Sequence, residues 1–279
     1  MAPQPGHDLP KVVVRRLRKE YIDSRDFLSA LLQARLAGLL GQKEPWLAQH
    51  KNACDGQTCF VLGNGPSLKN FSPDILGQLP SFGTNGVFLH FVPTFFVTIS
   101  TEFYKNYVKH IRNLQCHRKF IGSYLTDIIT HTESESLLNC SWNVYGSFLR
   151  WNLPVPMRFS TRADRVVYLG GSVLFVCLQL AYWLGFAKVI LLGVDHDFGL
   201  DRSELVYGGT RLVVGKKDRF HFSKDYLRPE TTAHCDMLAT ERAFRLALEA
   251  FQTSRREIVN ATPSTKLEMI PKVELEDVL

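Results

Sequence analysis

The feature that most constrains this chain is a short apolar run that leads directly into a glycine-rich turn. Residues 58–62 (Thr-Cys-Phe-Val-Leu) have the composition of a buried strand, and residues 63–68 (Gly-Asn-Gly-Pro-Ser-Leu) follow without a break. Glycine lets the backbone approach a ligand closely, and successive free N–H groups form a cradle for an anion. The pattern predicts a phosphate-binding turn at the carboxyl end of a strand. Its residues are Gly63, Asn64, Gly65, Pro66 and Ser67.

The glycine spacing disfavours two familiar classes of nucleotide-binding protein. Leu68 stands where the pattern G-x-G-x-x-G requires a third glycine after Gly63 and Gly65, and the chain contains no G-x-x-x-x-G-K-[ST] segment. An NAD enzyme and a P-loop kinase are therefore disfavoured. A turn that closes a strand without binding a ligand stays an alternative.

Two further turns resemble the first in composition. Residues 83–86 (Gly-Thr-Asn-Gly) contain Asn85, whose amide offers a donor and an acceptor to a base or a sugar, although a simple hairpin turn would use the same residues. At Gly171 and Ser172 a turn opens an apolar helix, and its free amides suit an anion, although ordinary N-capping explains them too. Doubly wound sheets bind ligands outside the carboxyl ends of their strands, so we expect the three turns to share one crevice.

Short apolar strands alternate with helical patterns from residue 58 onward. We expect strands at residues 58–62, 94–99, 119–121, 188–192 and 258–260, and helices at residues 102–114, 172–184 and 232–251. The alternation predicts an α/β fold with a Rossmann-like, mostly parallel sheet and helices on both faces. Residues 126–156 and 200–228 do not fit this pattern, and the second of these segments is expected to form a lid-like loop.

We divide the chain into an N-terminal helical extension, residues 1–55, and a main domain, residues 56–279. Four basic residues within residues 12–18 precede an amphipathic helix that begins near Asp23 or Ser24 and ends at Gly41. Packing against the outside of the main domain is the simplest interpretation of this helix. Peripheral contact with a membrane surface and formation of a homo-oligomer are the alternatives.

Composition indicates a folded, soluble protein but does not select its ligand. The 279 residues are 45% hydrophobic and 22% charged, which excludes a disordered tail, a collagen-like fibre and a disulfide miniprotein. The net charge of +6 is compatible with an anionic ligand, a nucleic acid or an acidic membrane surface. The six cysteines lack C-x-x-C spacing and no secretory signal is visible, so a cytoplasmic location with reduced thiols is expected.

A cluster of ionisable residues follows the strand expected at residues 188–192. Asp195, His196 and Asp197 contain a D-x-D pattern, whose oxygen ligands would suit Mn²⁺ or Mg²⁺. Alternation along a strand would direct the two carboxylates to opposite faces, unless the turn redirects one of them. We therefore favour a loop-orienting or substrate-contacting role for Asp195 and expect neither a metal nor a cofactor.

The three turns in this order, with Leu184-Gly185-Phe186 and Gly193-Val194-Asp195 after them, resemble the DUF115 (MptE-like) family. The same arrangement, over about residues 58–262, is similar to the bacterial family 42 sialyltransferases, in which the G-N-G-P-S motif and a later small-residue turn hold a CMP-sugar. The resemblance implies a GT-A-variant fold and transfer of an acidic sugar from a CMP-activated donor without a metal. It also implies that the acceptor is a glycan or glycolipid and that the protein takes part in cell-surface polysaccharide biosynthesis. No nucleic-acid partner is expected.

The resemblance further implies roles for three side chains outside the turns. His234, near the start of the last helical pattern, matches the histidine that acts as general base in those sialyltransferases. Tyr207 and Tyr226 are candidates for the tyrosines that support the leaving phosphate. His221 is a competing general base, because the segment that contains it could close over the donor and a neutral imidazole can accept a proton near pH 7.

Two other functional classes stay open. DUF115 members that resemble 6-hydroxymethylpterin diphosphokinases would make the protein a Mg²⁺-dependent pyrophosphoryl transferase that uses ATP. That hypothesis makes Asp195 and Asp197 the magnesium ligands. A non-catalytic nucleotide-binding or scaffold protein would bind a similar ligand without turnover.

Overall fold

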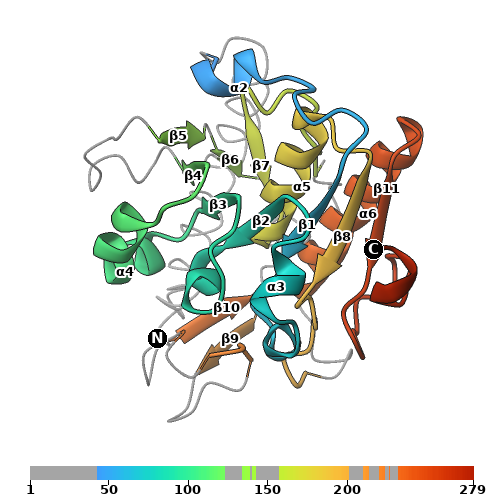
Figure 1. The fold of residues 1–279 in the computed structure, drawn as a ribbon. Helices are drawn as coiled ribbons and strands as arrows, with labels where there is room; N and C mark the ends of the chain where they lie inside the picture. The colour runs from blue at the N-terminus through green and yellow to red at the C-terminus, as the bar shows by residue number, and fades with distance from the viewer. Residues whose placement is uncertain are drawn as a thin grey trace, which may run out of the picture.

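The centre of the protein is a seven-stranded parallel sheet. The computed structural model describes residues 43–122, 134–138, 140–142, 157–200, 210–213, 220–223, 226 and 232–279. Every neighbouring pair in the sheet is parallel, as Figure 1 shows, and this confirms the α/β, Rossmann-like prediction. In spatial order the strands are β11 (Glu257–Asn260), β8 (Lys188–Leu192), β1 (Thr58–Leu62), β2 (Ser81–Thr84), β3 (Phe95–Thr98), β4 (Arg118–Gly122) and β5 (Glu135–Leu138).

Helices cover both faces of this sheet, because its strands are apolar on both sides. Cys59 and Val61 of β1 belong to one hydrophobic cluster, whereas Phe60 and Leu62 belong to another. The first cluster includes residues of α2 (Pro45–Gln49), α5 (Val173–Leu184) and α6 (Met237–Thr253). The second includes residues of α3 (Pro73–Leu76), α4 (Thr101–Asn113) and the 3-10 helices η1 (Pro66–Asn70), η2 (Asn85–Leu89) and η6 (Leu275–Asp277).

Two small two-stranded sheets accompany the main one. β6 (Cys140–Trp142) and β7 (Val167–Leu169) are parallel, whereas β9 (Thr210–Val213) and β10 (Thr232–Cys235) are antiparallel. The helix expected from residue 232 is therefore wrong over its first residues, which pair with β9. The helix begins instead at Met237, where the Asp236 carboxylate accepts from the Ala239 amide at 3.0 Å.

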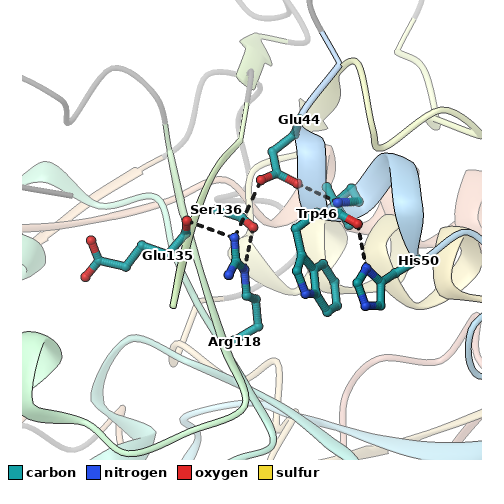
Figure 2. A network of polar contacts seen from close by, with 7 residues as sticks. Glu44, Trp46, His50, Arg118, Glu135 and Ser136 are labelled. Atoms are coloured by element: carbon teal, nitrogen blue, oxygen red, sulfur yellow. Dashed lines mark hydrogen bonds and ion pairs between the residues drawn. The ribbon is translucent and has the colours of Figure 1, made fainter. Parts of the chain in front are cut away.

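α2 is fixed to the start of β4 and to β5 by a network around Arg118, shown in Figure 2. The Arg118 guanidinium donates to the Ser136 hydroxyl at 2.7 Å and to the Glu135 carbonyl at 3.0 Å, and it lies 3.8 Å from the Glu44 carboxylate that caps α2. It also lies over the Trp46 ring, 5.3 Å from the ring centroid. Burial lowers the pKa of Arg118 from its ordinary value. The chain from Glu44 onward is thus part of the main body.

The helix expected before Gly41 lies outside the described residues, as do residues 1–42 altogether. Large parts of the expected lid-like segment, residues 201–209, 214–219, 224–225 and 227–228, lie outside them too. Among the described residues, no helix has the length and apolarity needed to span a membrane.

A buried glutamine holds the start of β7 and the preceding chain against α5. Gln179 is fully buried, and its side-chain oxygen accepts from the amides of Ser160 and Tyr168 at 3.0 and 2.9 Å. Its side-chain nitrogen donates to the carbonyls of Tyr168 and Phe175 at 2.8 and 3.0 Å. One side chain therefore satisfies four buried backbone groups.

Gln179→Leu is expected to lower the free energy of unfolding by about 3 kcal/mol or more, because it leaves buried amides and carbonyls without partners. Urea denaturation followed by circular dichroism measures the change. The matched control is Gln78→Leu at an exposed site, which should change stability by less than about 0.5 kcal/mol. Similar losses in the two variants would contradict the role assigned to Gln179.

Candidate functional site

A cavity of about 450 Å³ lies at the carboxyl edge of the parallel sheet. Strands β2 to β5 extend the sheet to one side of β1, whereas β8 and β11 extend it to the other, so the strand order reverses between β1 and β8. Ligands of open α/β sheets bind at such a reversal. The walls of the cavity include residues 63–65, 84–85, 171–174 and 193–198. All three glycine turns therefore meet at this cavity.

The first glycine turn uses its amides within the protein. Gly63 donates to the Leu192 carbonyl at 2.8 Å and Gly65 donates to the Gly193 carbonyl at 2.9 Å. The Ser67 amide lies 3.2 and 3.3 Å from the Asp195 carboxylate oxygens, and the Ser67 hydroxyl donates to that carboxylate at 2.7 Å. Pro66 has no N–H, and the anion that the Ser67 amide and hydroxyl bind within the protein is the Asp195 carboxylate.

Glycine is required here for the packing of two turns. A Cβ atom at Gly63 would overlap the Gly193 carbonyl oxygen, and one at Gly65 would overlap the Asp195 carboxylate. The turn after β1 thus packs directly on the turn after β8. This close approach explains both glycines without a ligand.

Asn64 presents an unused acceptor in the first turn. Its side-chain nitrogen donates to the Thr84 hydroxyl at 2.7 Å, and its carbonyl accepts from the Phe222 amide at 3.0 Å. Its side-chain oxygen is buried and has no hydrogen-bond partner within the described part of the chain. Because Asn64 lines the cavity, this oxygen can accept from an N–H or O–H group of a ligand.

The second turn supports an aromatic stack that lines the cavity. Asn85 has a positive φ of 44°, and its side-chain oxygen accepts from the Thr98 hydroxyl at 3.0 Å. A Cβ atom at Gly86 would overlap the Tyr226 ring, so this glycine makes room for the tyrosine. The Tyr226 ring stacks on His221 with 3.9 Å between ring centroids. His221 and Tyr226 both line the cavity.

The third turn brings the amino ends of two helices to the cavity. Gly171 has a positive φ of 78°, and the Ser172 hydroxyl caps α5 by accepting from the Leu174 amide at 3.3 Å. Asp236, the N-cap of α6, and Thr240 in its first turns also line the cavity. The amino end of α5 carries partial positive charge and favours an anion, whereas the Asp236 carboxylate already caps the amino end of α6.

Residues 195–197, which follow β8 after Gly193 and Val194, each have a different partner. Asp195 binds Ser67, His196 lies 3.5 Å from the Glu241 carboxylate, and Asp197 lies 2.9 Å from the Lys266 amine. The hydrogen bond from Lys266, together with that from the Gly199 amide, lowers the pKa of Asp197. The two aspartates therefore do not converge as the D-x-D hypothesis requires. Within the described residues no group of three or more histidine, cysteine, aspartate or glutamate side chains is suited to hold a metal ion.

Of the remaining residues expected at the site, two lie outside the described lining of the cavity and two cannot be placed relative to it. Pro66 and Ser67 belong to η1 and are not among the described residues that line the cavity. His234 lies on β10, where its backbone pairs with Arg211 two residues before Asp236, and its side chain is outside what the structure describes. Tyr207 lies outside the described residues.

The sequence analysis missed the contribution of α4 and α6 to the walls. Ser100, the N-cap of α4, lines the cavity together with Asn106 and Tyr107 from within α4, and Thr240 and Phe244 line it from α6. The sequence carried a signal for Ser100, because this N-cap stands two residues after the end of β3. A helix that begins at the carboxyl end of a third parallel strand must begin near the same edge.

Comparisons with known proteins leave the family open. No family model matches the chain, and no curated protein matches it. Among solved structures it is similar to the sialyltransferase CstII from Campylobacter jejuni, determined in complex with a substrate analogue, cytidine-5'-monophosphate. The two chains are 13% identical with a TM-score of 0.45, and the match covers 78% of this chain and 85% of the other. This likeness concerns the path of the backbone and is not used to infer function. Membership in the DUF115 family stays a prediction.

Asp195→Ala is expected to lower the free energy of unfolding by about 1–3 kcal/mol, because it leaves the buried Ser67 amide and hydroxyl without their acceptor. Asp197→Ala is the matched control. Its ion pair with Lys266 is 46% and 59% exposed, and such pairs contribute about 1 kcal/mol or less. Urea unfolding of both variants measures the difference, and equal losses would contradict the structural role of Asp195.

Proposed function

We propose that the protein is a glycosyltransferase that transfers an acidic sugar from a CMP-activated donor to a hydroxyl of a glycan or glycolipid. The convergence of the three turns and of the amino ends of α5 and α6 on one cavity carries the proposal. Its volume of about 450 Å³ lies within the ordinary range for small-molecule sites. The order of the three motifs, which is similar to that of the family 42 sialyltransferases, suggests the class of donor.

The cavity offers groups for both halves of such a transfer. The bond between the sugar and the phosphate oxygen breaks while the acceptor oxygen attacks, so negative charge grows on the departing CMP and the acceptor loses a proton. The amino end of α5 favours the negative charge. His234 and His221 are the candidate general bases, and the proposal requires no metal. A neutral imidazole suits that task near pH 7.

Asn64 supports a nucleoside in the same cavity. Its buried side-chain oxygen lacks a hydrogen-bond donor within the described residues, and the neighbouring Thr84 and Asn85 also line the wall. Amino and hydroxyl groups of a nucleoside are donors that this oxygen can accept. We propose that Asn64 and Asn85 contact the nucleoside part of the donor and that Gly171 and Ser172 face its phosphate.

The ATP-dependent alternative has less support, because Asp195 and Asp197 bind separate partners within the protein. A non-catalytic binding protein would differ by forming no product. The cytoplasmic location, the homo-oligomer and the membrane contact of the N-terminal helix stay predictions.

CMP is expected to raise the melting temperature more than UMP, ADP or GMP, with or without Mg²⁺. A ligand that binds only the folded state at about 100 times its Kd stabilises that state by about 2.7 kcal/mol. Differential scanning fluorimetry measures the shift, and mass spectrometry of the product measures turnover of CMP-sugars in the presence of EDTA. Equal shifts for all four nucleotides, or turnover only with ATP and Mg²⁺, would refute the proposal.

Asn64→Ala is expected to weaken CMP binding about 10-fold, because it removes a buried acceptor from the wall of the cavity. Isothermal titration calorimetry measures the affinity. Asn70→Ala, at an exposed position in η1, is the matched control and should bind CMP like the unaltered protein. An unchanged Kd for Asn64→Ala would show that Asn64 does not contact the nucleotide.

A further inference from the structure

An anion in this cavity needs a side-chain partner that the glycine turn does not provide. The amides of Gly63, Gly65 and Ser67 are bonded within the protein. Among the described residues that line the cavity, the charged side chains are aspartates, and neither lysine nor arginine occurs. The described lining contains two imidazoles, His196 and His221. A phosphate is therefore expected to contact one of these histidines.

The two imidazoles differ in what surrounds them. His196 faces the Glu241 carboxylate at 3.5 Å, which directs it toward α6. His221 lies beside the first glycine turn, because the amide of the next residue, Phe222, donates to the Asn64 carbonyl at 3.0 Å. The chain beside His221 is thus bonded to Asn64, the residue that we propose to contact the nucleoside, and both residues line the cavity.

The His221 ring is held by a buried tyrosine. The rings of His221 and Tyr226 are nearly parallel, with 12° between their planes and 3.9 Å between their centroids. Tyr226 is only 5% exposed, and its ring lies against Gly86 and at 5.5 Å from the ring of Phe103. The Tyr107 hydroxyl reaches the Tyr226 carbonyl at 3.5 Å. A chain of contacts therefore runs from the second turn through Tyr226 to His221.

We propose that His221 donates a hydrogen bond to the phosphate of the bound nucleotide and that the Tyr226 ring positions His221. This inference rests on the proposed function. During transfer, the bond between the anomeric carbon and the phosphate oxygen breaks and its electron pair goes to that oxygen, which the N–H group of His221 stabilises. The acceptor oxygen forms the new bond to the anomeric carbon, and its proton goes to the general base, for which His234 is the candidate. In this proposal His221, rather than the Tyr226 hydroxyl, supports the leaving phosphate.

The decisive measurement compares CMP with cytidine, which lacks the phosphate. His221→Phe keeps an aromatic ring for the stack but has no N–H, so CMP should bind about 10- to 100-fold more weakly while the Kd of cytidine stays unchanged. The matched control is His110→Phe on the exposed surface of α4, outside the described lining of the cavity, and it should bind both ligands normally. Isothermal titration calorimetry provides all these constants.

Two tyrosine variants separate positioning from direct contact. Tyr226→Phe keeps the ring and should bind CMP normally, whereas Tyr226→Leu removes the stack and should lose CMP affinity without losing cytidine affinity. A loss of CMP affinity in Tyr226→Phe equal to that in His221→Phe would overturn the positioning role. Because Tyr226→Phe and His221→Phe both keep an aromatic ring in the stack, the test does not depend on the folding of Tyr226→Leu.

The outcomes distinguish the two proposals. If the unaltered protein binds neither CMP nor cytidine, the proposed function fails. If it binds CMP more tightly than cytidine and His221→Phe leaves that preference intact, the proposed function survives and the role of His221 is refuted. Equal affinity of the unaltered protein for CMP and cytidine would also refute that role.

Discussion

The contact between Asp195 and Ser67 is the constraint on which the rest of the site depends. These residues lie 128 positions apart in the chain, in the segments that follow two adjacent strands, β8 and β1. Hydrogen bonds to a carboxylate are stronger than those between neutral groups, and this one is supported by close packing at Gly63 and Gly65. The contact joins the turns after β1 and β8 at the edge of the sheet where the strand order reverses, and residues of both turns line the cavity.

This arrangement changes how the cavity can recognise an anion. The Ser67 amide and hydroxyl already bind the Asp195 carboxylate, and the Gly63 and Gly65 amides bind backbone carbonyls, so a phosphate is expected to use other groups. The amino end of α5 and the imidazole of His221 are the described features that favour negative charge, because the Asp236 carboxylate already caps α6. The first turn then contributes mainly through Asn64 and through the wall that it forms.

Much of the fold was predictable because its strands are buried on both faces. Continuous apolar runs such as residues 188–192 are typical of central parallel strands, and the turns after them are recognisable from their glycines. The start of the last helix was not predictable in this way. Residues 232–235 form β10 because they pair with residues 210–213, and no periodicity within residues 232–251 contains that information. The contribution of Asn106 and Tyr107 to the cavity likewise depends on where α4 crosses the edge of the sheet.

By itself, the sequence determined that this chain forms a parallel α/β sheet and that its glycine turns lie at the carboxyl ends of strands, because apolar periodicity and backbone freedom are local properties. Only the tertiary structure decided which groups the turn amides bind. Asp195 becomes the partner of Ser67, and the Leu192 and Gly193 carbonyls become the partners of Gly63 and Gly65, because β8 lies beside β1. Hydrogen bonds between distant segments depend on strand order. The same is true of the contact between the Tyr226 ring and Gly86, whose residues lie far apart in the sequence and meet only in the folded chain.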